Sequence, residues 1–398
     1  MKQKRYLASL NRLAATCRRL PTARAALVLS VVLIPALFAT RSAQAQTFSV
    51  LYSFKGGTDG GAPQGGLVQD ASGNLYGTTY AGGAHQKGVV FKVDPSGNET
   101  VLYSFNGQTD AGNPYAGVIM DASGNLYGTA EGGEGSSLGA VFKLDPQGNF
   151  TVLHTFNGID GESPYAPLLM DSAGNLYGTT EGAGAFHNGT VFKIDSTGNF
   201  TTLYSFAGKP DGDEPYAGLI MDSAGNLYGT TRHGGSQERG TVFKIDPTGK
   251  ESVLVSLAGG MGEYPMAGLV EDSAGNFYGT LLNGGDDDCG QVFKVDPSGK
   301  ATALYTFGGG LKGKYPYAGL VMDGSGNLYG TTFQGGAFQY GQVFEVNATG
   351  LPTFLHSFSG KDGAYPYAGL FRDSAGNLYG TTTAGGAGGA GTVFKITP

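Results

Sequence analysis

The 398-residue sequence contains no tryptophan and only two cysteines, Cys17 and Cys289, and its charged fraction is just 14%. After residue 45 it also lacks any segment with the 3.6-residue hydrophobic periodicity of an amphipathic helix. The shortage of cysteine excludes a disulfide-rich scaffold, so the stability of the chain must come from packing. The absence of helical periodicity predicts an all-β protein.

Residues 1–45 differ from the rest of the chain and predict a secretory signal peptide. Basic residues precede an apolar run over residues 25–39, and Ala43 and Ala45 place small side chains at the positions that a signal peptidase reads. The alternative is a membrane anchor, but the apolar run is shorter than the ~20 residues a spanning helix needs, and Pro35 interrupts it. We therefore expect a secreted, periplasmic or extracellular protein with no membrane span once the leader is removed.

The leader also hides the acidity of the mature chain. It carries eight basic residues and no acidic ones, so its removal leaves 17 of the 25 Lys and Arg residues against 32 Asp and Glu residues, a formal charge of −15. An acidic surface repels phosphate backbones, which argues against nucleic acid as a partner. Cys17 leaves with the leader, so we expect no internal disulfide.

A ten-residue block dominates the remaining chain. Its sequence at residues 222–231 is Asp-Ser-Ala-Gly-Asn-Leu-Tyr-Gly-Thr-Thr. The tyrosines of seven close copies follow one another at intervals of 50 or 51 residues: Tyr76, Tyr127, Tyr177, Tyr228, Tyr278, Tyr329 and Tyr379. So regular a period indicates one supersecondary unit copied in tandem, and it predicts a single domain of seven ~50-residue repeats over residues 46–398.

Each repeat contains four short apolar runs separated by turn residues. In one repeat these predicted strands are residues 203–206, 216–221, 227–231 and 241–245. Three of their connections are compact, whereas the fourth is long and crosses to the next repeat. Seven such units predict a seven-bladed β-propeller of four-stranded antiparallel blades. The N-terminal strand at residues 50–54 is expected to pair with the three C-terminal strands, the last at residues 393–396, and to close the ring.

The chain resembles the GloVer-type tandem-repeat exported proteins. The resemblance rests on the seven copies of the ten-residue block, most of them followed by Gly-Gly and then by Val-Phe-Lys, and it covers nearly all of residues 47–398. It implies secretion and a propeller-like fold, and it implies no catalytic residues.

Five tyrosines at the start of the predicted inner strands are the first candidate ligand-binding residues. The ring geometry would place them around one mouth of a central channel, where phenol rings can stack on sugars or hold an aromatic side chain. The alternative is packing between blades. The positions are Tyr115, Tyr165, Tyr216, Tyr317 and Tyr367, with Gln64 and Met266 in the other two blades.

Two histidines in loops of the same face are further ligand-binding candidates. His187 and His233 lie in neighbouring blades with Glu238 nearby, an arrangement that raises a metal or acid–base site as an alternative. The Asp-Gly pairs of the crossovers are interpreted as turns rather than as a ring of cation ligands. Asp286, Asp287 and Asp288 are interpreted as a solvated loop tip.

No catalytic constellation, metal site or cofactor motif is identified, so the chain is predicted not to be an enzyme. The favoured function is an exported binding or scaffold propeller, expected to be a monomer, that recognises a glycan or a protein through its variable-loop face. The alternatives are a propeller-fold polysaccharide lyase or hydrolase, and a passive envelope or matrix protein.

Overall fold

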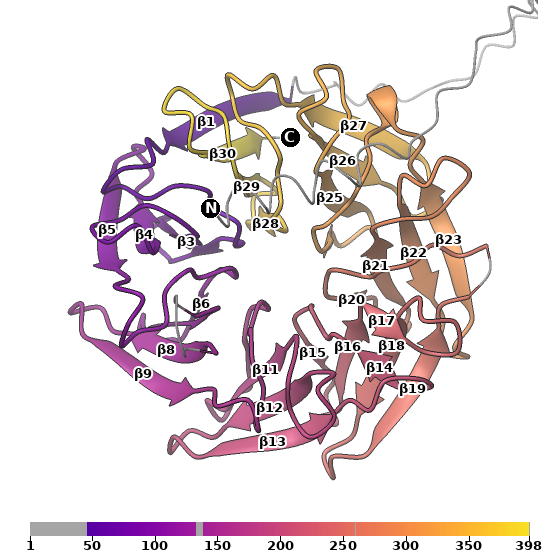
Figure 1. The fold of residues 1–398 in the computed structure, drawn as a ribbon. Coiled ribbons are helices and arrows are strands. Elements are labelled where there is room, and N and C mark those ends of the chain that lie inside the picture. The colour runs from indigo at the N-terminus through magenta and orange to yellow at the C-terminus, as the bar shows by residue number, and fades with distance from the viewer. Residues whose placement is uncertain (1–45, 133–137, 259, 398) are drawn as a thin grey trace, which may run out of the picture.

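The computed structural model describes residues 46–132, 138–258 and 260–397. The leader predicted at residues 1–45, with Cys17, lies outside the described residues. The described ranges form seven four-stranded antiparallel sheets arranged as a ring (Figure 1). The predicted seven-bladed propeller is therefore confirmed. Within those ranges, no helix has the length and apolar character needed to cross a membrane.

The first four blades follow one another along the chain. Blade 1 contains β2 (Val68–Gln69), β3 (Leu75–Thr79), β4 (Val89–Val93) and β5 (Glu99–Ser104). Blade 2 contains β6 (Ile119–Met120), β7 (Leu126–Ala130), β8 (Ala140–Leu144) and β9 (Phe150–Thr155). Blade 3 contains β10 (Leu169–Met170), β11 (Leu176–Thr180), β12 (Thr190–Ile194) and β13 (Phe200–Ser205). Blade 4 contains β15 (Ile220–Met221), β16 (Leu227–Thr231), β18 (Thr241–Ile245) and β19 (Glu251–Ser256).

The last three blades complete the ring. Blade 5 contains β20 (Val270–Glu271), β21 (Phe277–Leu281), β22 (Gln291–Val295) and β23 (Ala301–Thr306). Blade 6 contains β24 (Val321–Met322), β25 (Leu328–Thr332), β26 (Gln342–Val346) and β27 (Pro352–Ser357). Blade 7 contains β28 (Phe371–Arg372), β29 (Leu378–Thr382), β30 (Thr392–Thr397) and β1 (Thr47–Ser53). Outside the blades, β14 (Gly212–Asp213) pairs with β17 (His233–Gly234), and η1 (Gly310–Lys312) is a single 3-10 turn.

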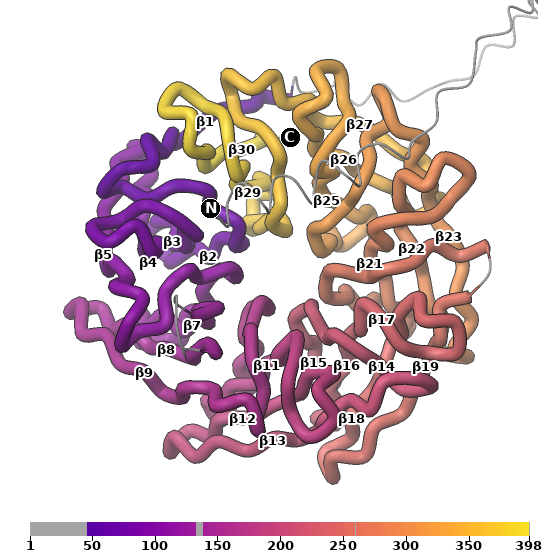
Figure 2. Tube along the Cα trace, in the orientation of Figure 1, coloured from indigo at the N-terminus to yellow at the C-terminus, as the bar shows by residue number. Residues whose placement is uncertain are grey.

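The ring closes as the sequence predicts. Strand β1 pairs antiparallel with β30, from Thr47 opposite Thr397 to Ser53 opposite Thr392. The indigo β1 therefore lies beside the yellow C-terminal strands in Figures 1 and 2. This pairing joins the two ends of the propeller through backbone hydrogen bonds and covers the edge that β30 would otherwise expose.

The innermost strands are shorter than predicted. The sequence favours a strand over residues 216–221, but only Ile220–Met221 is paired as β15. Pro215 has no N–H to donate, and the backbone of the next residues faces the preceding blade instead. The carbonyl of Ala217 accepts a hydrogen bond from Thr179 Oγ1 of blade 3 at 3.1 Å. Residues 216–219 therefore form contacts with the neighbouring blade instead of extending the sheet.

The repeated block folds into one turn stabilised by its first aspartate. Asp222 Oδ1 accepts the backbone N–H groups of Ala224 and Asn226, both at 2.9 Å. Asp222 Oδ2 accepts the Asn226 amide at 2.7 Å and the Tyr228 hydroxyl at 3.0 Å. Gly225 takes the positive φ, 82°, whereas Asn226 does not. Asn226 is used for its amide donor.

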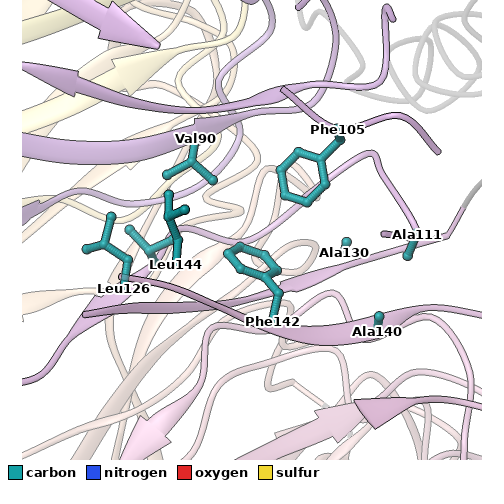
Figure 3. Close-up of a cluster of buried hydrophobic side chains, with 9 residues drawn as sticks. Val90, Phe105, Ala111, Leu126, Ala130, Ala140, Phe142 and Leu144 are labelled. Carbon is teal, nitrogen blue, oxygen red and sulfur yellow. The ribbon is translucent and has the colours of Figure 1, made fainter. Parts of the chain in front are cut away.

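Pairs of phenylalanines fill the junctions between blades. Between blades 1 and 2, Phe105 meets Phe142 edge to face with ring centroids 5.3 Å apart (Figure 3). Both rings are completely buried in a cluster with Val90 and Leu126. Gly128 lies opposite Phe142 in the sheet, and a Cβ there would approach the ring to 2.6 Å. The glycine of each Leu-Tyr-Gly-Thr motif is thus required because the neighbouring strand places a phenyl ring over it.

Candidate functional site

The two sides of the ring are built from different connections. The near-identical turns between the first two and the last two strands of each blade lie on one side, called here the turn face. The longer loops between the middle strands and the crossovers lie on the other, the variable face. On the variable face, each crossover pairs with the loop between the middle strands of the blade that it enters. In blade 4, for example, Gly212 of the crossover pairs with Gly234 of the loop.

A strained residue turns each crossover toward the centre of the ring. In blade 4 this residue is Glu214, with φ of 54°. Its N–H donates to the carbonyl of Asn188 in blade 3, and its carbonyl accepts from the Arg232 N–H. Pro215 follows and delivers Tyr216 to the inner end of the blade. The corresponding residue has positive φ in all seven blades: Ala62, Asn113, Ser163, Glu214, Tyr264, Tyr315 and Tyr365.

The five predicted tyrosines converge at the centre of the variable face. Tyr115 of blade 2 contacts Tyr165 of blade 3, with ring centroids 4.8 Å apart, and Tyr216 of blade 4 at 5.8 Å. It also contacts Tyr367 of blade 7 at 5.5 Å, although blade 1 lies between these two blades around the ring. Tyr317 stacks on Tyr367 at 4.8 Å. The rings therefore meet one another across the ring of blades instead of lining an open mouth.

These tyrosines differ in exposure. Tyr115 and Tyr317 are buried, at 6% and 9% exposure, whereas Tyr165, Tyr216 and Tyr367 are half-buried. Packing between blades, the alternative reading of these residues, therefore accounts for part of the cluster. We call the half-buried rings of Tyr165, Tyr216 and Tyr367 the tyrosine floor. Gln64 takes the tyrosine position in blade 1, and its Oε1 is buried without a hydrogen-bond partner.

A glutamate joins two tyrosines on one side of this floor. Glu131, directly after β7, accepts the Tyr80 hydroxyl through Oε2 and the Tyr165 hydroxyl through Oε1, both at 3.1 Å. Burial, and then the negative charge of Glu131, raise the pKa of Tyr165 well above its ordinary value. The phenol therefore stays protonated and acts as a donor to the carboxylate.

An arginine and two more glutamates continue the same side into blades 3 and 4. Arg232 Nη1 lies 3.1 Å from Glu214 Oε2 and 4.0 Å from Glu181 Oε1. His233 Nε2 lies 3.5 Å from Glu214 Oε2. We call Glu131, Glu181, Glu214 and Arg232 the charged arc. It holds three carboxylates for one guanidinium.

Within the charged arc, the surroundings of Glu181 shift its titration. Burial, followed by the negative charge of Glu214, raises the pKa of Glu181 to about 7, although Arg232 acts in the opposite direction. Its side chain is nevertheless 25% exposed, so solvent and solutes can reach it. A carboxyl group with this pKa can gain or lose a proton near neutral pH, which suits it to respond to an approaching charge.

The other side of the floor is apolar. Leu282, Tyr315, Tyr317 and Phe333 form a buried cluster. Partly buried side chains of blades 5 and 7 pack against it: Tyr264, Met266, Tyr365 and Tyr367. We call these eight residues the aromatic arc. His233 links the two arcs, because its ring also contacts Tyr264 with centroids 4.9 Å apart.

The remaining residues that the sequence analysis singled out, His187 and Glu238, lie in exposed loops. His187 is exposed in the loop of blade 3, and Glu238 is an exposed residue whose carboxylate lies 3.9 Å from Lys209 Nζ. Within the part of the chain that the structure describes, no group of three or more His, Cys, Asp or Glu side chains could hold a metal ion. The roles predicted for His187 and His233 stay predictions.

The sequence relationships agree with this architecture. The model of the Gloeobacter/Verrucomicrobia repeat matches residues 36–224 and 215–398. The chain belongs to this repeat family. The resemblance that the repeated block predicts is thereby confirmed. No sequence among the curated proteins matches the chain.

Solved structures similar to this family member are distant in sequence. The extracellular domain of a candidate hybrid two-component system from B. thetaiotaomicron has a TM-score of 0.59 at 13% identity, over 87% of this chain and 39% of that one. A candidate 6-phosphogluconolactonase from Bacteroides uniformis has a TM-score of 0.53 at 16% identity, over 77% of this chain and 88% of that one. At these identities the similarity shows the fold alone.

Sequence reasoning singled out the tyrosines but missed the glutamates of the charged arc. Aligning the repeats of this family member provides a signal that could have found Glu131 and Glu181. The residue directly after each Leu-Tyr-Gly-Thr-Thr block differs from blade to blade: Tyr80, Glu131, Glu181, Arg232, Leu282, Phe333 and Thr383. A position that varies this widely next to near-identical residues lies where the scaffold does not dictate the side chain.

Proposed function

We propose that this family member is an exported binding propeller and that it holds its ligand over the tyrosine floor between the charged arc and the aromatic arc. The observation that carries the proposal is the excess of carboxylates around Arg232, partly exposed and beside half-buried aromatic rings. A recognition site of this composition presents negative charge on one side and ring faces on the other. The scaffold repeats sevenfold, whereas this composition does not.

The chemistry favours a ligand with an ammonium group attached to a ring or an alkyl chain. Carboxylates attract the ammonium group, and aromatic faces stabilise a cation by roughly 0.5–2 kcal/mol depending on desolvation. The Gln64 Oε1 acceptor, buried without a partner, adds a site for an N–H or O–H donor. Such an ammonium group occurs in two sources: the amino sugars of a glycan and the lysine side chains of a protein.

The first experiment uses matched probes that differ in one charge. Fluorescent chito-oligosaccharides are offered with free or with acetylated amines, and lysine peptides are offered with free or with acetylated side chains. We expect the free-amine member of one pair to bind and its acetylated partner to bind at least tenfold more weakly. The pair that binds identifies the source. Equal binding of both members of each pair, or of neither, contradicts the proposal.

A double substitution tests the floor itself. Tyr165→Ala with Tyr216→Ala removes two half-buried rings from adjacent blades, and we expect binding of the free-amine probe to weaken at least tenfold. Aromatic anchors at interfaces contribute about 1–2 kcal/mol each, which accounts for such a loss. The matched control is Phe338→Ala, which removes an exposed ring from a loop of the same face (57% exposed).

The interpretation depends on the fold of the double variant. The tyrosines act in packing if Tyr165→Ala/Tyr216→Ala unfolds while Tyr165→Phe/Tyr216→Phe keeps the stability and binding of the wild type. A folded double variant that binds normally would move the ligand elsewhere.

A polysaccharide lyase or hydrolase is the second candidate. An enzyme of this kind needs carboxylate, arginine, histidine and tyrosine groups close together, and the charged arc with His233 and Tyr165 supplies all four. A carboxyl group with a pKa of about 7, such as that of Glu181, is suited to general acid–base work. Incubating acidic and neutral polysaccharides with the wild type and with Glu181→Gln tests this candidate. Product release that disappears in the variant supports an enzyme, and no product with either protein supports binding alone.

A further inference from the structure

The outer strands contain a second set of positions that vary from blade to blade. In three blades, a phenylalanine at or next to the start of the outer strand stacks on an aromatic ring of the preceding blade. In blade 2, Phe150 stacks on Tyr103 of blade 1 with ring centroids 3.9 Å apart and an interplanar angle of 8°. In blade 3, Phe200 stacks on His154 at 3.7 Å. In blade 7, Phe48 stacks on His356 at 3.6 Å.

The stacked tyrosine or histidine is bonded to an aspartate of the crossover. Tyr103 donates its hydroxyl to Asp110 Oδ2 at 2.8 Å, and His154 Nε2 lies 3.0 Å from Asp160 Oδ2. The same pair recurs at five junctions, since Tyr52–Asp59, Tyr204–Asp211 and His356–Asp362 complete the set. The aspartates predicted to serve crossover turns therefore also anchor the outer strands. The two remaining junctions carry Val255 and Tyr305 at the same position.

Glutamate replaces phenylalanine at two of these five junctions. Glu99 occupies the register position of Phe150, since each pairs with the last residue of the strand before it. Glu251 occupies the same position in blade 4. In both glutamates, Oε1 is buried and has no hydrogen-bond partner. A carboxyl group thus lies where three other blades place a phenyl ring.

The groups facing these glutamates are acidic or neutral. Glu99 faces Tyr52 of β1 and Asp59 of the crossover, and Glu251 faces Tyr204 of β13 and Asp211. Burial, followed by the charge of the nearby aspartate, raises the pKa of each glutamate to about 7. Among the residues that the structure describes, no cation acts on the pKa of either glutamate. An ionised carboxylate at these positions is therefore neither paired nor fully hydrated.

We propose that Glu99 and Glu251 make two of the seven junctions pH-responsive, so that the contacts between blades 7 and 1 and between blades 3 and 4 tighten when these side chains are protonated and loosen when they ionise. The two junctions divide the ring into blades 1–3 and blades 4–7. The ring of this exported protein is accordingly most stable in mildly acidic surroundings and gains two points of local opening in alkaline surroundings.

The direction follows from proton linkage. A carboxyl group whose pKa is raised on folding binds its proton more tightly in the folded state. Its stabilising contribution is full below the unfolded pKa, near 4.5, and is lost as the pH rises through about 7. Both glutamates act in the same pH window, so their effects on the slope of stability against pH add.

The test compares the pH dependence of unfolding in matched variants. Denaturant unfolding of the wild type between pH 5 and pH 8 should show a midpoint that falls with pH. In Glu99→Gln/Glu251→Gln the fall should be smaller, because the native state loses the proton uptake of two groups. Glu238→Gln, an exposed loop substitution, should behave as the wild type. Parallel curves for the wild type and the double variant would overturn the proposal.

The reciprocal substitution keeps the test decisive if the glutamine variant folds poorly. Phe150→Glu installs the same arrangement over Tyr103 and Asp110, and it should steepen the fall of the midpoint with pH. Hydrogen exchange adds a local readout: amide protection of β5 and β19 should decrease from pH 5 to pH 8, after correction for intrinsic exchange, more than that of β9 and β27, which border neither glutamate junction. A Phe150→Glu variant with the wild-type slope, or equal changes in all four strands, would contradict the proposal.

Discussion

The turn face and the variable face differ in what the seven repeats keep the same. On the turn face, one network recurs in every blade: the tyrosine of the repeated block donates its hydroxyl to the aspartate six residues earlier at 2.9–3.1 Å. On the variable face, the backbone is repeated just as closely, since the residue before the proline that ends each crossover has positive φ in all seven blades. Its side chain, however, ranges from Ala62 to Glu214 and Tyr365. Identical backbone with unlike side chains is the composition expected of a surface on which different ligands can be selected.

The comparison also separates two kinds of strain. Gly225 on the turn face adopts its positive φ at little cost, because glycine has no Cβ. Glu214 and its six equivalents adopt a positive φ with a side chain and before a proline, which costs of order 1–3 kcal/mol in each blade. The hydrogen bonds from both sides of Glu214 hold it in place. Strain is therefore concentrated on the variable face, where it orients the tyrosines.

The largest effect is expected from removing β1, the strand that closes the ring and connects the two faces. Deletion of residues 47–55 takes away β1 and exposes the edge of β30, so we expect aggregation or loss of cooperative unfolding. Size-exclusion chromatography and thermal unfolding measure the outcome. A truncated protein that stays monomeric and unfolds at the wild-type temperature would show that the closing pair is dispensable.

An intermediate effect is expected from a single turn. Gly225→Val places a β-branched residue at φ of 82° and should lower the free energy of unfolding by about 1–3 kcal/mol. Ser223→Ala in the same turn should be nearly silent, because Ala71 and Ala122 stand at that position in other copies. Denaturant unfolding measures both. Equal effects would show that the glycine conformation does not limit the turn.

The smallest effect is expected from one proton on the variable face. With a pKa of about 7, Glu181 is ionised in roughly a tenth of molecules at pH 6 and in most at pH 8. Binding of a free-amine probe should therefore strengthen several-fold from pH 6 to pH 8. Glu181→Gln should flatten this profile, whereas Glu238→Gln should keep it. A profile that persists in Glu181→Gln would assign the titration to another group.

The sequence by itself determined the fold, the strand order and the closure of the ring. Two facts suffice: the 50- or 51-residue period, and turn residues whose partners lie within six positions, as Tyr228 and Asp222 do. The predicted strands at residues 227–231 and 241–245 coincide with β16 and β18, because alternating side chains and flanking glycines are local signals. The inner strand was overestimated, since the hydrogen bond from Thr179 that diverts Ala217 comes from another blade.

Only the tertiary structure decided what the centre of the variable face is made of. Tyr115 touches Tyr367 although more than 250 residues separate them in the chain, and that contact exists only because the ring closes and brings the inner ends of blades 2 and 7 together. Glu131, Glu181 and Arg232 follow a block that looks like scaffold in every copy. Their charges form one cluster because neighbouring blades project equivalent positions toward one axis. The distance of those positions from the axis is set by the packing of all seven blades together, which no single repeat specifies.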